Sequence, residues 1–325
     1  RRELYQWDHM RGDMVIDPVI KVPPAIRDTG FGVAEDVDIV RTDPDSSVVS
    51  RHFHIQIRDE ADIDKIRMGS VKKILGELNK LAANDSEKYQ TFWKEFGRVL
   101  KEGIVDDAEN KDRIADLLRF ATTREDGQTV SLAQYCERMR DKQKVIYYIT
   151  AENHAAAKDS PHLEYFRKND IEVLLLSDHI DEWLVNHLTE YKDKPLKSVA
   201  KGALPDDELE EQEEDKKAHE EKAESLKYLT DAIREKLVDR VKDVRLSRRL
   251  TDSPACLIAD EHDLGGNLQR ILEAAGQDAP DFKPILEINP DHEIIGRISP
   301  DSPDIEDWAH VLLDQATLSE GAPLK

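Results

Sequence analysis

Two histidines spaced two residues apart, His52 and His54, are the first residues in the chain whose spacing could serve chemistry. Alternate residues of a strand point to the same face, so both imidazoles could bind one metal ion. No third ligand follows at a spacing typical of a metal site, and an ordinary strand is the better interpretation. The run 205–222 has ten acidic side chains, but it lacks the alternating positions and central glycine of a calcium loop. We interpret it as a solvated helix or linker.

Sequence motifs for nucleotide binding or covalent catalysis are absent. Residues 29–32 read Thr-Gly-Phe-Gly, which is too short for a phosphate loop and lacks the Lys and Ser/Thr that would follow. There is no nucleophile elbow, dinucleotide fingerprint or zinc spacing. The many carboxylates and histidines therefore indicate no catalytic mechanism.

Charge and composition narrow the class of partner. The 325 residues have 47 basic and 69 acidic side chains and a net charge of −22, which repels nucleic acid and anionic membranes. Cys136 and Cys256 have no partner spacing, which indicates a reducing cytoplasm. No apolar run approaches the roughly 20 residues of a membrane span. The chain begins with Arg1, so we expect a fragment of a larger cytoplasmic protein with no nucleic acid or membrane partner.

The elements that position any site are clearest in residues 144–191. Short β-rich apolar runs at 145–149 and 171–176 read as buried strands. Ser160 before Pro161 predicts the start of the helix between them, and Asp178 is a candidate cap for a helix that includes Trp183. Strand, crossover helix and strand predict a βαβ unit with a parallel sheet. The predicted fold class is α/β.

Helices and a second small domain flank this unit. Helical periodicity begins at Val71, continues with an aromatic stripe over 89–100, and is followed by a capping box at Ser131 and Gln134. Strands are expected at 244–246, 255–258 and 284–288, which makes the C-terminal domain α+β. An amphipathic helix has apolar residues at i, i+4, i+7 and i+8, namely Leu264, Leu268, Ile271 and Leu272. The last helix has a stripe suited to a helix–helix interface: Ile305, Trp308, Leu312, Leu313 and Ala316.

From about Gly69 to the end, the chain resembles bacterial members of the heat-shock protein 90 family of molecular chaperones. The segments that show the resemblance are SEKYQTFWKEFGRVLKEG at 86–103, LLRFATT at 117–123, IYYITAENHAAAKDSPHLEYFRKNDIEVLLLSDHIDEWLVNHLTEY at 146–191, KDVRLSRRLTDSPACLIA at 242–259, AAGQ at 274–277, LEINPDH at 286–292 and WAHVLLDQATL at 308–318. The resemblance implies a helical segment packed on the βαβ unit, as the C-terminal part of a middle domain at 69–201. An acidic linker or helix at 202–224 and a dimerisation domain at 225–325 follow.

The resemblance also implies site residues and partners. Trp183 and Asn186 match a WxxN helix whose surface contacts unfolded or partly folded client proteins. Leu264, Leu268, Ile271 and Leu272 match a second, projecting client-binding helix. Ile305, Trp308, Leu312, Leu313 and Ala316 match part of a dimer bundle, so a homodimer is expected. A mixed apolar and polar surface suits weak binding of many sequences. From the residues alone, ordinary packing is the better interpretation of Trp183.

Nucleotide chemistry is not expected of this chain. Full-length relatives use ATP and Mg²⁺, but the nucleotide-binding domain and the catalytic-loop arginine of the early middle domain have no counterpart here. We therefore expect no enzyme activity, no catalytic residues, no metal site and no cofactor. The sequence ends before the last segment of the family, so dimerisation is expected to be weakened.

Residues 1–68 show a different resemblance. RRELYQWDHMRGDMVIDPVIKVPPAIRDTGFGV and DPDSSVVSRHF are similar to a stretch of uroporphyrinogen-decarboxylase-like proteins. We expect this segment to be unrelated to the chaperone part, poorly packed and inactive. It leaves one alternative function open, an enzyme of the decarboxylase or methyltransferase type. A non-catalytic scaffold or interaction module is a third possibility.

Overall fold

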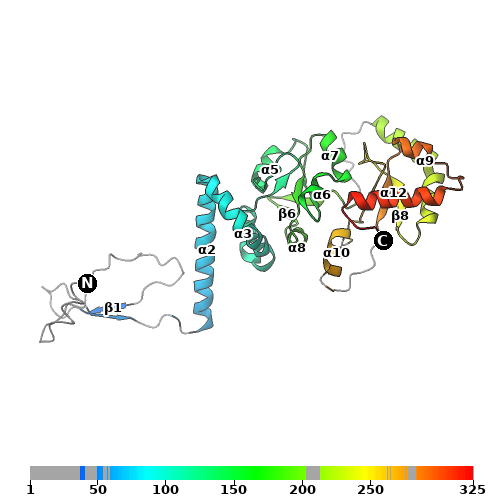
Figure 1. Ribbon diagram of the computed structural model, residues 1–325. Helices are drawn as coiled ribbons and strands as arrows, with labels where there is room; N and C mark the ends of the chain where they lie inside the picture. Colours follow the sequence, from blue (N-terminus) through cyan, green and yellow to red (C-terminus); the bar gives the residue numbers. More distant parts are fainter. Residues whose placement is uncertain are drawn as a thin grey trace. The chain divides into compact units, whose positions relative to one another are not determined.

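Two units make up the chain, Arg1–Asn84 and Asp85–Lys325 (Figure 1). The structure is a computed structural model, and it describes residues 37–40, 50–53, 57, 59–202, 213–261, 263, 265–274, 276 and 283–324. Within these ranges, no helix is both long and apolar enough to cross a lipid bilayer. His54 and Leu264 lie outside the described residues.

The first unit contains a hairpin and one long helix. Strands β1 (Val37–Val40) and β2 (Ser50–Phe53) pair antiparallel. Helix α2 (Glu60–Asn84) begins about two and a half turns before residue 69, where the sequence resemblance was expected to start, and runs through that boundary without a break. Glu60 and Asp62 lie in its first turn, where carboxylates favour the positive end of the helix dipole. The sequence prediction missed this start because residues 60–68 were grouped with the N-terminal segment of different resemblance.

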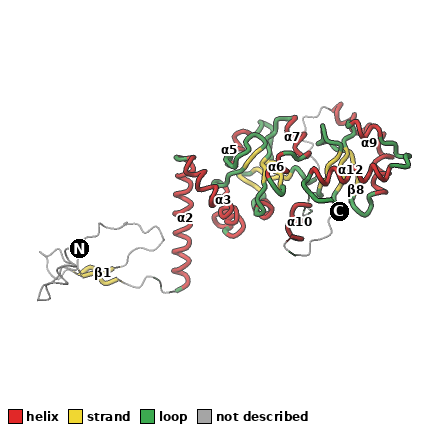
Figure 2. The backbone as a smooth tube through the Cα atoms, in the orientation of Figure 1, coloured by secondary structure: helices red, strands yellow, loops and turns green. Residues whose placement is uncertain are grey.

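The second unit contains two sheets, and Figure 2 shows its strands in two groups. The first sheet has the order β3-β5-β4-β7-β6. β4 pairs parallel with both β5 and β7, so the predicted βαβ unit is confirmed. The expectation of a parallel sheet is correct only for these three central strands, because the edge strands β3 and β6 are antiparallel. The strands are β3 (Ala121–Thr122), β4 (Ile146–Thr150), β5 (Leu174–Leu176), β6 (Glu190–Tyr191) and β7 (Lys194–Ser198).

Both faces of the central strands are covered. Tyr147, Ile149 and Leu175 pack with Phe166, and the intervening residues of β4 and β5 are also buried, on the opposite face. Continuous apolar strands of this kind are typical of parallel strands between two helical layers. The helices of this part are α3 (Ser86–Asp106), α4 (Lys111–Ala115), α5 (Leu132–Arg138), α6 (His154–Lys158), α7 (Glu164–Lys168) and α8 (Asp181–His187), with 3-10 turns at Ala108–Asn110 and Pro161–Leu163.

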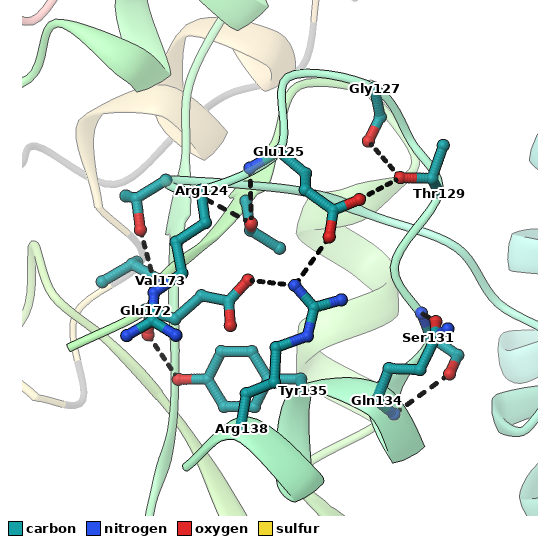
Figure 3. Close-up of polar contacts among 12 residues, drawn as sticks. Arg124, Glu125, Gly127, Thr129, Ser131, Gln134, Tyr135, Arg138, Glu172 and Val173 are labelled. Atoms are coloured by element: carbon teal, nitrogen blue, oxygen red, sulfur yellow. Dashed lines mark hydrogen bonds and ion pairs between the residues drawn. The ribbon is translucent and has the colours of Figure 1, made fainter. Parts of the chain in front are cut away.

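A polar network joins α5 to the loop at 125–129 and to Glu172, which lies just before β5 (Figure 3). The predicted capping box is confirmed, because the Ser131 hydroxyl accepts from the Gln134 amide and the Gln134 side chain accepts from the Ser131 amide. At the other end of α5, the Arg138 guanidinium lies 2.6 Å from Glu125 and 3.5 Å from Glu172, so it bridges two carboxylates. This network fixes the loop that precedes α5.

The buried stripe of α3 differs from the predicted one. Its buried residues are Tyr89, Trp93, Gly97, Lys101 and Ile104, at spacings of three and four. Phe96 and Val99, which the aromatic stripe placed in the core, are more than half exposed. The pattern was misread because a glycine and a lysine occupy buried positions.

The second sheet, with the order β8-β10-β9, forms the C-terminal part of the unit. The strands expected at 244–246 and 255–258 are present as β8 and β9, and β10 lies between them in the sheet, parallel to β8 and antiparallel to β9. Helices α9 and α12 pack on this sheet around one apolar core. The elements are α9 (Glu213–Lys236), β8 (Asp243–Leu246), β9 (Ala255–Ile258), α10 (Gly266–Ala274), β10 (Ile285–Ile288), α11 (Glu293–Arg297) and α12 (Ile305–Ser319). The second half of the acidic run, from Glu213, is the start of α9.

Candidate functional site

Helix α8 places the first two predicted client-contacting residues at the surface. Trp183 is half-buried and Asn186 is exposed, and residues three apart lie on one helix face. The Asn186 amide donates to the main-chain oxygen of Glu182 at 2.8 Å, which holds this side chain along the helix. The pair therefore offers an aromatic surface beside a polar one.

A buried ion cluster lies beneath α8. Lys101 of α3 is 1% exposed, and its ammonium lies 2.7 Å from Asp178 and 2.8 Å from Asp181. Asp178 was expected to cap α8, but its carboxylate faces Lys101 instead. The Asp181 side chain accepts from the Asp178 amide at 2.9 Å. Two carboxylates on one buried cation thus fasten α8 to α3.

Burial and charge affect the two carboxyls differently. Burial alone would raise the pKa of Asp178, but the Lys101 ammonium, together with Gln128 and Arg98, outweighs it and the pKa is lowered. Asp181 is 1% exposed, so burial dominates and raises its pKa in spite of Lys101. Asp181 is less exposed to water than Asp178, so it depends more on Lys101 to remain ionised.

Helix α10 supplies the second predicted surface. Leu268 is buried, whereas Ile271 and Leu272 are half-buried. The two partly exposed residues are apolar neighbours one turn into the helix. Ile271 and Leu272 are therefore accessible to a binding partner, whereas Leu268 is not.

The structure brings α8 and α10 together. The Asn267 amide nitrogen donates to Glu182 Oε1 at 2.6 Å, and the two helices lie close together in Figure 1. A cavity of about 270 Å³ adjoins this contact, with walls from β4, β7, β9, α10 and α12. The Lys201 ammonium lies on its wall and donates to the Asp263 main-chain oxygen at 2.7 Å. The sequence placed Trp183 and Asn186 on one helix and Ile271 on another, and the Glu182–Asn267 hydrogen bond joins these two helices.

Helix α12, the predicted dimer helix, buries its apolar stripe inside its own unit. Ile305, Leu312, Leu313 and Ala316 are all below a tenth exposed, and Trp308 is half-buried against the same core. They pack on β9 and α9. A second copy that contacts α12 would meet its other face, where Val311 and Leu318 are exposed.

A third set of contacts joins the middle part, residues 85–202, to the C-terminal part, residues 213–324; we call it the seam. The Glu164 carboxylate accepts from the amides of Thr251, Asp252 and Ser253 at 2.6, 2.8 and 3.1 Å. Arg249, 2% exposed, donates to the Val199 and Gly202 main-chain oxygens and to Glu287. The seam holds together the two parts that contain α8 and α10.

Sequence reasoning missed the residues that position the surface. The sequence offered one indication for Lys101, since a charged residue on the buried face of an amphipathic helix needs a partner of opposite charge. No local sequence feature indicated the roles of Glu164 and Glu182, because their partners lie 85 or more positions away in the chain. Within the described residues, no cluster of histidine, cysteine and carboxylate side chains could hold a metal ion.

Comparisons with known proteins agree with the resemblance. The chain is 54% identical over 275 residues to the chaperone protein HtpG of Nitrosomonas europaea, an alignment that covers 83% of this chain and 43% of that protein. It is 51% identical over 316 residues to HtpG of Aromatoleum aromaticum, an alignment that covers 95% of this chain and 47% of that protein. It is 47% identical over 317 residues to HtpG of Paraburkholderia xenovorans, and this alignment covers 96% of this chain and 48% of that protein. The chain spans less than half the length of these curated relatives.

These alignments bear on the N-terminal segment. The model of the family "Hsp90 protein" matches residues 49–325, so the match begins 20 residues before the expected boundary at 69 and includes the whole of α2. None of these matches supports the alternative of a decarboxylase or methyltransferase. With most of its length matched, the chain belongs to the Hsp90 protein family.

Proposed function

We propose that this chain is the client-binding part of a cytoplasmic chaperone. Its substrates are unfolded or partly folded proteins, and its surface for them comprises Trp183 and Asn186 on α8 with Ile271 and Leu272 on α10. The proposal rests on one observation: two helices with partly exposed apolar side chains meet at the Glu182–Asn267 hydrogen bond. Apolar groups among polar ones suit weak binding of many unfolded segments.

Further parts of the proposal concern assembly and chemistry. We propose that two copies associate, as the resemblance implies, and that binding by this chain needs no nucleotide. The net charge of −22 keeps the chain away from nucleic acid and favours client segments that are basic.

Aggregation of heated citrate synthase, measured by light scattering without nucleotide, tests the client surface. We expect the chain to suppress scattering, and Trp183→Ala/Asn186→Ala to need about tenfold more protein for the same effect, since truncated hot-spot residues cost above 1 kcal/mol. Tyr228→Ala is the matched control, because Tyr228 is an exposed aromatic residue on α9.

The outcomes separate the candidate functions. An equal loss of aggregation suppression in Tyr228→Ala would show that any exposed aromatic residue can support client binding. If the folded chain has no effect at all, the proposal is wrong and a scaffold function is favoured.

A further inference from the structure

The hydrogen bond between α8 and α10 is partly buried. Asn267 Nδ2 lies 2.6 Å from Glu182 Oε1, and Glu182 is 5% exposed. A hydrogen bond to a carboxylate is short and stronger than a neutral one, and a buried carboxylate without its donor is costly. The pair therefore favours one arrangement of the two helices.

The neighbours of Asn267 fix which end of its amide faces Glu182. The Arg270 guanidinium lies 3.4 Å from Asn267 Oδ1, so the amide oxygen faces a cation and the nitrogen faces the carboxylate. Before the helix, Gly265 has a φ of +82°, and a Cβ there would lie 3.3 Å from Lys201 Cε. The start of α10 is thereby packed against Lys201, whose ammonium holds the preceding loop at Asp263.

Glu182 is also the residue on which the α8 surface depends. It precedes Trp183, and its main-chain oxygen accepts from the Asn186 side chain. On α10, Ile271 lies one turn after Asn267 and so faces the same side of its helix. A shift of either helix at this bond would change the spacing between Trp183 and Ile271.

We infer that Glu182 and Asn267 are positioning residues that hold α8 and α10 as one binding surface for an extended, unfolded polypeptide segment that contacts both helices. This inference rests on the proposed function. Because Glu182 is nearly inaccessible, it acts through the placement of Trp183 and Ile271 and does not contact the client. Two contact points at fixed spacing strengthen binding of a long segment through the high effective concentration of the second contact. A short peptide that reaches only one helix gains nothing from that spacing.

Reversal of the hydrogen bond tests the inference. In Asn267→Asp two carboxylates face each other, whereas in Glu182→Gln/Asn267→Asp the glutamine amide can donate to the aspartate. The probes are reduced, carbamidomethylated lysozyme, which is basic and permanently unfolded, and short tryptic peptides from it, with binding followed by fluorescence anisotropy. We expect Asn267→Asp to weaken binding of the whole protein about tenfold, to change peptide binding less than about twofold, and the double variant to recover most of the loss.

Each contrary result has one meaning. Unchanged binding of the whole protein by Asn267→Asp, or a loss that the double variant does not recover, overturns the inference. Equal weakening for short peptides also overturns it, because the residues would then be direct contacts. If the wild-type chain binds neither probe, the proposed function is wrong, and with it the role in client binding.

Hydrogen exchange separates failure of the link from failure of the function. We expect the amides of α10 to exchange faster in Asn267→Asp and to regain protection in the double variant, with or without client. Unchanged protection in Asn267→Asp would overturn the positioning role even if the chain binds clients.

Discussion

At the scale of single residues, Lys101 shows how a buried charge supports an exposed site. Its ammonium serves Asp178 and Asp181 together and lies 5.5 Å from the centre of the Phe120 ring. Removal of one partner of a buried ion pair is far more costly than replacement of the whole set by apolar groups. Lys101 therefore determines whether α8 stays docked on α3.

We predict that Lys101→Met lowers the free energy of unfolding by about 3–5 kcal/mol at neutral pH, because Asp181 loses its cation and Asp178 keeps only the exposed Arg98. Urea unfolding followed by circular dichroism measures this loss. The deficit should shrink as the pH falls, since the carboxyls of the variant become neutral by taking up protons.

Two further variants complete this test. Lys101→Met/Asp178→Asn/Asp181→Asn should recover part of the stability because no unpaired charge remains. Lys80→Met is the matched control, because Lys80 forms an exposed pair with Glu77, and such pairs contribute at most about 1 kcal/mol. A Lys101→Met variant as stable as the wild type would show that the cluster does not hold α8.

At the scale of elements, α12 shows why a correct stripe does not reveal its partner. Periodicity identified Ile305, Leu312, Leu313 and Ala316 as one face, and the structure confirms that they share a face. The same pattern suits a core within the chain or a contact between copies. In the structure, that face packs on β9 and α9.

We predict that Leu312→Ala lowers the free energy of unfolding by about 2–5 kcal/mol, the usual cost of a cavity at a buried leucine. The loss should be the same at low and high protein concentration, because the side chain packs within its own chain. Urea unfolding at two concentrations measures both values. Val311→Ala, on the exposed face of α12, is the control and should change stability by less than about 0.5 kcal/mol.

The sequence predicted correctly those elements that are specified by residues close together in the chain. The strands at 146–150 and 174–176 were found because continuous apolar β-rich runs are distinctive, and Ser131 with Gln134 because a capping box spans only four residues. The insertion of β10 between β8 and β9 was missed because strand order depends on distant pairing. The approach of Glu182 to Asn267 was missed for the same reason. Trp183 and Asn186 were predicted as client contacts from the resemblance alone, since their residue types fit ordinary packing.

At the scale of the whole second unit, the seam joins two parts with separate sheets and separate cores. One carboxylate, Glu164, accepts three main-chain amides across it. Burial alone would raise the pKa of Glu164, but the hydrogen bonds from the Ser253 side chain and from the three amides outweigh it and lower the pKa. The charged form is therefore the one that holds the seam.

We predict that the Glu164 contribution is lost in acid. Because the folded-state pKa is lowered, the stabilisation is complete above the unfolded-state value, about 4.3, and disappears as the pH falls through the folded-state pKa. Glu164→Gln should cost about 1 kcal/mol at pH 7, a value reduced for partial solvent screening. The difference from wild type should vanish in acid, as measured by urea unfolding across the pH range.

A second glutamate separates the seam from general surface charge. Glu293 pairs with Arg297 on the exposed face of α11, so Glu293→Gln should change stability by less than about 0.5 kcal/mol at any pH. Hydrogen exchange adds the location, because loss of Glu164 should speed exchange at the amides of 251–253 and leave those of β4 protected. A Glu164→Gln deficit that persists unchanged in acid would contradict a charged Glu164 as the support of the seam. The placement of α10 beside α8 would then depend on the other contacts between the two parts, among them those of Arg249, the Lys201–Asp263 hydrogen bond and the Glu182–Asn267 hydrogen bond.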